Sequence, residues 1–282
     1  MGTTTGISWT DHTQNPWLGC QKVSPACENC YAEVSPPIRT NRANGLELWG
    51  PPSTTPRLRT GVKNWNLPLR WNRAAEKAGR RAQVFCASLS DVFEDHPMLP
   101  PWRADLWKLI EQTPWLNWQL LTKRPQNILS MIPRAWVETP RDNVWYGTTV
   151  EDQRRADERI PELLRVPGIV RFLSMEPLVS PVDITRYMGG PSCIDWAIIG
   201  GESGPAARPF NLDWARSLIA QCRTEAVVIW LKQLGSRPEL TPGPIAWPIT
   251  DSHGSDQSEW PADLRVQQFP PNALYGGLDD QP

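Results

Sequence analysis

The chain has 282 residues, a formal net charge of −1 and a pI near 6.3. A molecule this close to neutral has no broad attraction for nucleic acid or anionic lipid, so any contact with a polyanion has to be local. The first residues, MGTTTGISWTDHTQ, lack the basic and apolar regions of a secretory signal, and no run approaches the roughly 18 apolar residues of a membrane span. We therefore expect a soluble, intracellular protein with no membrane partner.

Three cysteines lie close together near the N-terminus, in the segment GCQKVSPACENCYAE. They are Cys20, Cys27 and Cys30, and no fourth cysteine or histidine follows nearby. Thiolates at this density in a reduced cytosol usually bind a soft metal, and three ligands in place of four leave one coordination position open. Three thiolates would satisfy three irons of a 4Fe-4S cluster and leave the fourth iron for a small chelating ligand, as in the reductive cleavage of S-adenosylmethionine.

Two alternatives remain open for this segment. The first is a structural zinc site with His12 as fourth ligand, because loop closure permits a ligand eight residues before Cys20. The second is three thiols without a metal. The other cysteines lie in or beside apolar runs, and we interpret them as small buried hydrophobic residues: Cys86, Cys193 and Cys222.

The stretch 35–81 is rich in Pro, Gly and Arg, with a predicted helix at 72–81. Within it, residues 57–81 carry eight Lys or Arg against a single Glu76, and two tryptophans interrupt the basic run. Basic side chains neutralise phosphates and indoles offer stacking faces, so this insertion is a candidate nucleic-acid contact. The residues we expect to make it are Arg70, Trp71, Arg73 and, from a later strand end, Arg124. An ordinary solvated basic face is the alternative.

From residue 83 onward the chain becomes regular. Short apolar runs predict strands at 83–89, 117–122, 143–149, 169–175, 195–201 and 226–232, and amphipathic segments predict helices at 101–112, 151–165 and 211–223. Strands and helices that alternate in this way indicate βα units and a parallel sheet. A further strand is expected before Cys20. Together these units favour an α/β fold that forms a full or partial TIM-type barrel, and they make an open doubly wound sheet the less favoured alternative.

Polar residues follow each of these predicted strands. Because barrel active sites collect where strands end, we expect the polar groups to line one pocket. The candidate catalytic carboxylates are Glu176 in SMEP and Glu202 in GGES, since each lies in a short Pro- or Gly-flanked turn directly after an apolar run. The alternatives are that polar residues gather at strand ends where the chain returns to water, or that either glutamate is a helix N-cap partner.

Beyond Gly235 the composition changes to a polar segment with few aliphatic runs. We expect residues 236–282 to form a partly ordered C-terminal tail that packs over the barrel. Two histidines flanked by Pro or Gly are interpreted as solvated loop residues, His96 and His253.

Six blocks of the chain resemble a phage and prophage family of radical-SAM-like proteins. They lie in order within residues 8–235: SWTDHTQNPWLGC, VSPACENCYAE, SLSDVFE, LLTKRP, RFLSMEPL and DWAIIGGESGPAARP. The resemblance implies a radical-SAM-type barrel over residues 1–235, including the basic insertion 35–81. It also implies a 4Fe-4S cluster on the three cysteines of the loop 17–33, with S-adenosyl-L-methionine as co-substrate.

The cysteine spacing departs from the usual superfamily pattern. The first gap has six residues where typical members have three, and the aromatic Tyr31 follows the third cysteine instead of preceding it. The segment SLSD at 88–91 stands where such barrels usually carry the GGE that binds the methionine amine, and a GGE occurs later, at 200–202. The cofactor contacts we expect are Tyr31, Ser88, Ser90, Asp91 and Lys123.

Relatives of this kind are similar to phage enzymes that hypermodify thymidine in their own DNA, where a radical step rearranges an amino acid attached to the base. The resemblance therefore implies a radical SAM isomerase that acts on a glycyl adduct of thymidine, with nucleic acid as the substrate. A reductant such as flavodoxin or ferredoxin would supply electrons, in the host cytoplasm if the protein is phage-encoded. The alternative function is a zinc-stabilised nucleic-acid-binding protein without catalysis.

Overall fold

The computed structural model describes residues 5–190, 193–241, 243 and 245–271. Its strands are β1 (His12–Gln14), β2 (Trp17–Leu18), β3 (Leu58–Arg59), β4 (Ala82–Cys86), β5 (Leu116–Thr122), β6 (Val144–Thr149), β7 (Val170–Met175), β8 (Trp196–Gly200), β9 (Phe210–Asn211), β10 (Val228–Gln233), β11 (Pro238–Leu240) and β12 (Ile245–Ala246). Its α-helices are α1 (Pro36–Ala43), α2 (Val62–Trp65), α3 (Leu67–Ala78), α4 (Leu99–Glu111), α5 (Ile128–Met131), α6 (Arg134–Glu138), α7 (Gln153–Leu164) and α8 (Leu212–Thr224). Short 3-10 helices lie in the connections: η1 (Pro25–Cys27), η2 (Pro125–Asn127), η3 (Thr185–Tyr187), η4 (Gln257–Glu259) and η5 (Ala262–Leu264).

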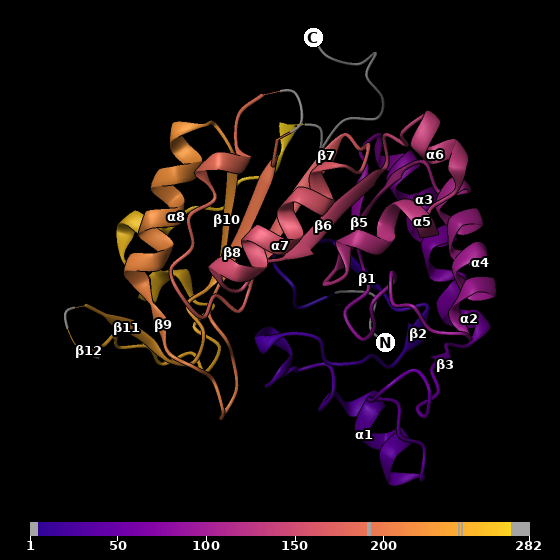
Figure 1. Ribbon diagram of the computed structural model, residues 1–282, viewed down its shortest axis with the longest axis horizontal. Coiled ribbons are helices and arrows are strands. Elements are labelled where there is room, and N and C mark those ends of the chain that lie inside the picture. The colour runs from indigo at the N-terminus through magenta and orange to yellow at the C-terminus, as the bar shows by residue number, and fades with distance from the viewer. Residues whose placement is uncertain (1–4, 191–192, 242, 244, 272–282) are drawn as a thin grey trace.

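Seven strands form one parallel sheet in the order β1-β4-β5-β6-β7-β8-β10. The sheet curls into a half-barrel with helices along its outer side (Figure 1). Within the part of the chain that the structure describes, β1 and β10 are not paired with each other, so the sheet does not close. The expected α/β class is confirmed, and the half-barrel is compatible with a partial TIM-type barrel.

The predicted strands and main helices are present at nearly the expected positions. The clearest difference is α3, which was expected at 72–81 and instead occupies Leu67–Ala78. Pro68 lies in its first turn, where the missing N–H breaks no helical hydrogen bond, so the helix extends further toward the N-terminus than its apolar periodicity indicates. It ends at Gly79, whose φ of 63° is the left-handed conformation that glycine adopts without strain. None of the described helices has the length and apolar character required to cross a bilayer.

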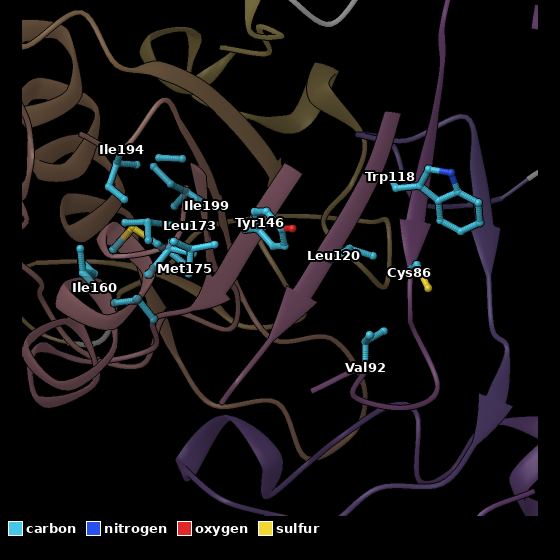
Figure 2. Packing of buried hydrophobic residues seen from close by; sticks show 14 of the residues in the cluster. Cys86, Val92, Trp118, Leu120, Tyr146, Ile160, Leu173, Met175, Ile194 and Ile199 are labelled. Atoms are coloured by element: carbon cyan, nitrogen blue, oxygen red, sulfur yellow. The ribbon is translucent and has the colours of Figure 1, made fainter. Parts of the chain in front are cut away.

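The two faces of the sheet carry separate apolar layers, because successive side chains of a strand point to opposite faces. On the convex face, Trp118, Leu120 and Tyr146 belong to the large core beneath the helices (Figure 2). On the concave face, a second cluster gathers around Trp196 and the N-terminal Trp9. Toward the carboxyl ends of the strands, the side chains that point to the concave face become polar. They are Lys123, Thr149, Ser174, Glu176 and Lys232.

The C-terminal segment packs along the free edge of β10. The backbone N–H of Leu231 donates to the carbonyl of Val266 at 2.8 Å, and that of Gln268 donates to the carbonyl of Ile229 at 2.8 Å. Trp260 from the same segment is buried in the core. The described part of the expected tail, up to residue 271, therefore covers an edge that would otherwise expose unpaired backbone groups.

A Gly147→Ala substitution tests how closely the concave layer is packed. Gly147 pairs with Phe172 across β6 and β7, and an added Cβ would lie 2.3 Å from the Phe172 ring, which is fully buried. We expect the free energy of unfolding to fall by about 1–3 kcal/mol, measured by urea denaturation. The matched control is Gly61→Ala, because Gly61 has a φ of −70° and no atom within 4 Å of its added Cβ. Equal stability of the two variants would contradict this packing.

Candidate functional site

A cavity of about 530 Å³ opens at the carboxyl ends of the parallel strands. Its wall combines concave strand residues, the cysteine loop 20–30, and residues from both terminal segments, including Trp9 and His253. Polar groups from six predicted strand ends contribute to it, as a barrel-type site requires: Ser90, Lys123, Thr149, Ser174, Glu202 and Lys232. His253 is exposed in its loop, as expected, and borders this wall. The same expectation was wrong for His96, which is buried with its ring 3.0 Å from the Thr55 carbonyl oxygen.

All three clustered cysteines line the cavity. Cys27 is buried, Cys20 and Cys30 are half-buried, and none of them forms a disulfide. Cys20 follows β2, where its backbone bridges to Trp49, and Cys27 ends the 3-10 helix η1. Three thiols of one loop therefore face one concave space.

Arg124 ties the start of the cysteine loop to the end of β5. Its Nη1 lies 3.9 Å from the Cys20 sulfur, and its Nη2 donates to the Gln21 carbonyl at 3.0 Å. The same guanidinium pairs with Asp91 at 2.8 Å. Burial raises the pKa of Cys20 to about 12, although the Arg124 charge opposes this shift. Arg124 is 8% exposed and already engaged, so the expected contact with nucleic acid is not available to it as folded.

Asp91 lines the cavity and positions Arg124. Its carboxylate accepts hydrogen bonds from Thr122 Oγ1 at 2.7 Å, from the Lys123 N–H at 3.1 Å and from the Phe93 N–H at 2.9 Å. Burial alone would raise the pKa of Asp91, but Arg124 and these hydrogen bonds hold it below its ordinary value. The expected contact of Asp91 with the cofactor stays a prediction.

Glu151 ties the middle of the loop to the end of β6. Its side chain is fully buried, accepts a hydrogen bond from the Ala26 N–H at 3.3 Å and pairs with Arg159 of α7 at 2.8 Å. A buried carboxylate is costly unless it is paired, so the Glu151 side chain is held where it can contact both the loop and α7.

Glu202 ties the end of the loop to the segment after β8. Arg208 contacts both of its carboxylate oxygens, at 2.7 and 3.0 Å, and the Asn29 amide donates to it at 3.1 Å. Arg208 also donates to the Pro25 carbonyl at 3.0 Å. Burial would raise the pKa of Glu202, but the hydrogen bonds from Arg208 and Asn29 lower it on balance. Glu202 lines the cavity and its carboxylate positions the loop, and the catalytic role expected for it stays a prediction.

The remaining expected cofactor residues divide into two kinds. Ser88 is engaged with Asn15 at 3.0 Å. Ser90 Oγ is buried with no hydrogen-bond partner among the described residues, and Ser90 lines the cavity. Lys123 and Tyr31 line it as well, and Lys123 makes no ion pair within the described ranges. Ser90, Lys123 and Tyr31 therefore remain available to a ligand.

Glu176 remains the other candidate catalytic carboxylate in the cavity. It lies just beyond β7 and forms an ion pair with Lys232 of β10, and both residues line the wall. Sequence reasoning placed both residues at strand ends but did not pair them. The only sequence signal for Lys232 is its position at the end of an apolar run. At that point the side chains of β10 that point to the concave face reach the cavity.

The basic insertion lies elsewhere. Arg70 and Arg73 are exposed on α3, and neither lines the cavity. Trp71 is 8% exposed and stacks on His12 with ring centroids 4.3 Å apart, so its faces are not open to a nucleotide base as expected. His12 is not among the residues that line the cavity, and its role as a fourth zinc ligand stays an untested alternative.

The described residues contain no group of three or more Cys, His, Asp or Glu side chains close enough to bind one metal ion.

Fold and site together define an α/β half-barrel protein with a three-cysteine cavity at the carboxyl ends of its strands. The chain belongs to the family DUF5131, described as a protein of unknown function, whose profile matches residues 4–255. Comparison with curated proteins and with solved structures gave no match.

A Glu202→Gln substitution tests the attachment of the loop. The neutral amide cannot pair with Arg208, so the local opening free energy of residues 24–33 should fall by about 1.5–3 kcal/mol. Native-state hydrogen exchange would then be roughly 10- to 100-fold faster in this segment. The control is Glu28→Gln, because the Glu28 side chain is 64% exposed and its contact with Arg208 is a surface ion pair. Similar exchange in both variants would contradict the attachment.

Alkylation tests the environment of Cys20. The thiolate is the reactive form, and a pKa raised from 9.0 to about 12 leaves far less of it at pH 8 in the folded chain than in the unfolded chain. We expect iodoacetamide to label Cys20 at least roughly tenfold more slowly in the folded, metal-free protein than in urea, measured by mass spectrometry of its peptide. Equal labelling rates would show that the thiol is not buried.

Proposed function

We propose that this protein is a radical SAM-type enzyme whose loop cysteines, Cys20, Cys27 and Cys30, bind a 4Fe-4S cluster at the mouth of the half-barrel. The observation that carries the proposal is the convergence of three free thiols from one loop on a single cavity at the carboxyl ends of parallel strands. The resemblance to phage and prophage radical-SAM-like proteins covers the same loop and strand ends.

The donor set fits such a cluster. Three thiolates would satisfy three of its irons and leave the fourth open to a small chelating ligand. Two cations lie beside the thiols: Arg124, itself paired with Asp91, is next to Cys20, and Lys123 is close enough to Cys30 to lower the pKa that burial raises. Positive charge there offsets the negative charge of thiolate ligands.

When bound, the cluster would supply the electron that cleaves S-adenosyl-L-methionine and gives a 5′-deoxyadenosyl radical. The residues of the chain would position and protect this chemistry. Ser90 Oγ and Lys123 offer a hydroxyl and a cation to the polar end of the co-substrate. Trp9 and Phe85 of the concave cluster form an apolar floor that excludes water.

The substrate we propose is a glycyl adduct of thymidine in DNA, and the reaction its isomerisation to a carbon-linked product. The cavity can receive such a group only if the modified base leaves the duplex stack, as in other enzymes that act on bases. Because Trp71 is covered and Arg124 is engaged, the exposed Arg70 and Arg73 are the two of the four expected residues left to contact phosphates. Flavodoxin or ferredoxin would provide the electron.

Anaerobic reconstitution with iron and sulfide tests the proposal. Wild-type protein should bind about four irons and four sulfides per chain and release 5′-deoxyadenosine from S-adenosyl-L-methionine with dithionite. Single Cys20→Ser, Cys27→Ser and Cys30→Ser variants should lose most of the iron and all measurable release. Cys193→Ser is the control, because Cys193 is a half-buried cysteine outside the cavity wall.

Two results would refute this function. One is a stoichiometry of one zinc per chain with no iron–sulfur absorption after reconstitution. The other is a fully loaded cluster that yields no 5′-deoxyadenosine and leaves glycyl-modified DNA unchanged.

A further inference from the structure

The ion pair between Glu176 and Lys232 crosses the cavity wall above the end of β8. Glu176 follows β7 and Lys232 belongs to β10, and β8 lies between these two strands. Gly200 at the end of β8 leaves room for the contact, because an added Cβ there would lie 3.4 Å from Glu176 Cγ. The two side chains are 17% and 18% exposed, and the exposed part faces the cavity that both residues line.

This pair differs from the charged groups that hold the cysteine loop. Arg124, Glu151 and Glu202 each bond the cysteine loop as well as an ion-pair partner. In the described residues, Glu176 and Lys232 have only each other as side-chain hydrogen-bond partners. The strands they join are already connected through β8, and a mostly buried ion pair is in general a poor net stabiliser. The fold therefore does not account for the pair.

We propose that the Glu176–Lys232 pair is an exchangeable subsite for a zwitterionic amino-acid head group. The ammonium of the ligand would replace Lys232 against the Glu176 carboxylate, and its carboxylate would replace Glu176 against the Lys232 ammonium. This exchange conserves the number of paired charges in the cavity, so binding leaves no isolated buried charge. A ligand with only one of the two charges would leave one wall residue unpaired and would bind more weakly.

The position of the pair places such a head group beside the cysteine loop. Tyr31 follows Cys30 and lines the same wall. The Tyr31 side chain is 55% exposed, and it lines the wall together with Glu176 and Lys232. Resting on the proposed function, two molecules bring this chemistry to the cavity: the methionyl head of S-adenosyl-L-methionine and the glycyl group of the modified nucleoside.

Calorimetric binding to Lys232→Met and Glu176→Gln tests the subsite, in protein as purified and after anaerobic reconstitution without reductant. The first pair of probes is S-adenosyl-L-methionine and its decarboxylated form. The second pair is 5-(carboxymethylaminomethyl)-2′-deoxyuridine and its methyl ester. For one of the two sets of probes, Lys232→Met should weaken binding of the probe that carries a carboxylate roughly tenfold or more. Its affinity for the matching probe without a carboxylate should be unchanged. The set of probes that shows this difference identifies the source of the head group.

Two further variants guard against effects on folding. The double variant Glu176→Lys with Lys232→Glu keeps an ion pair in place, and we expect it to fold as wild type and to bind the responding probe roughly tenfold or more weakly, because the charges are reversed. Glu158→Gln removes an exposed ion pair on α7 and should change no affinity.

The inference is overturned if Lys232→Met and Glu176→Gln bind both carboxylate probes as tightly as wild type, or if wild type binds neither. Its failure is separable from failure of the proposed function. If wild type releases 5′-deoxyadenosine and the variants bind the carboxylate probes as tightly as wild type, only the subsite is refuted. Charge-dependent binding without any 5′-deoxyadenosine release removes the reaction and keeps the subsite.

Discussion

The three cysteines share one cavity because buried charged side chains tie their loop to the sheet. Apart from the 3-10 helix η1, the loop 20–30 has no regular structure that would position its thiols. Arg124, Glu151 and Glu202 come from the ends of three different strands, and each bonds a separate part of it. Ordering irregular backbone costs about 1–2 kcal/mol per residue, and charged hydrogen bonds of about 1.5–3 kcal/mol each offset part of that cost.

These attachments also explain why so many charges lie in a mostly buried wall. Each carboxylate in them has an arginine partner and at least one further donor, so its charge is satisfied in several directions. The Glu176–Lys232 pair lacks such additional partners within the described ranges. The charges that attach the loop are therefore fully used by the protein, whereas the charges of Glu176 and Lys232 only neutralise each other. This difference separates residues that position the loop from residues that can meet a ligand.

Much of the fold could be predicted from the sequence, because βα alternation and apolar runs depend on local periodicity. The site was only partly predictable. Glu176 and Glu202 both follow apolar strands in short turns, so their local sequences indicate the same role. What distinguishes them is Arg208, which returns to Glu202 from the next turn, and Lys232, which reaches Glu176 across β8. The burial of Trp71 could not be predicted either, because His12, on which it stacks, is distant in the sequence.

An open half-barrel can exclude water from its concave side only if something covers the gap between β10 and β1. Both terminal segments do this. Trp9 packs against Phe85 with ring centroids 4.7 Å apart, and Phe269 packs against Trp230 at 4.7 Å. The Trp230 indole donates to Ser8 at 3.2 Å, which joins the last strand of the sheet to the N-terminal segment. The apolar floor beneath the cysteines therefore depends on chain segments outside the βα units, which is why the cavity wall includes residues from both ends of the described chain.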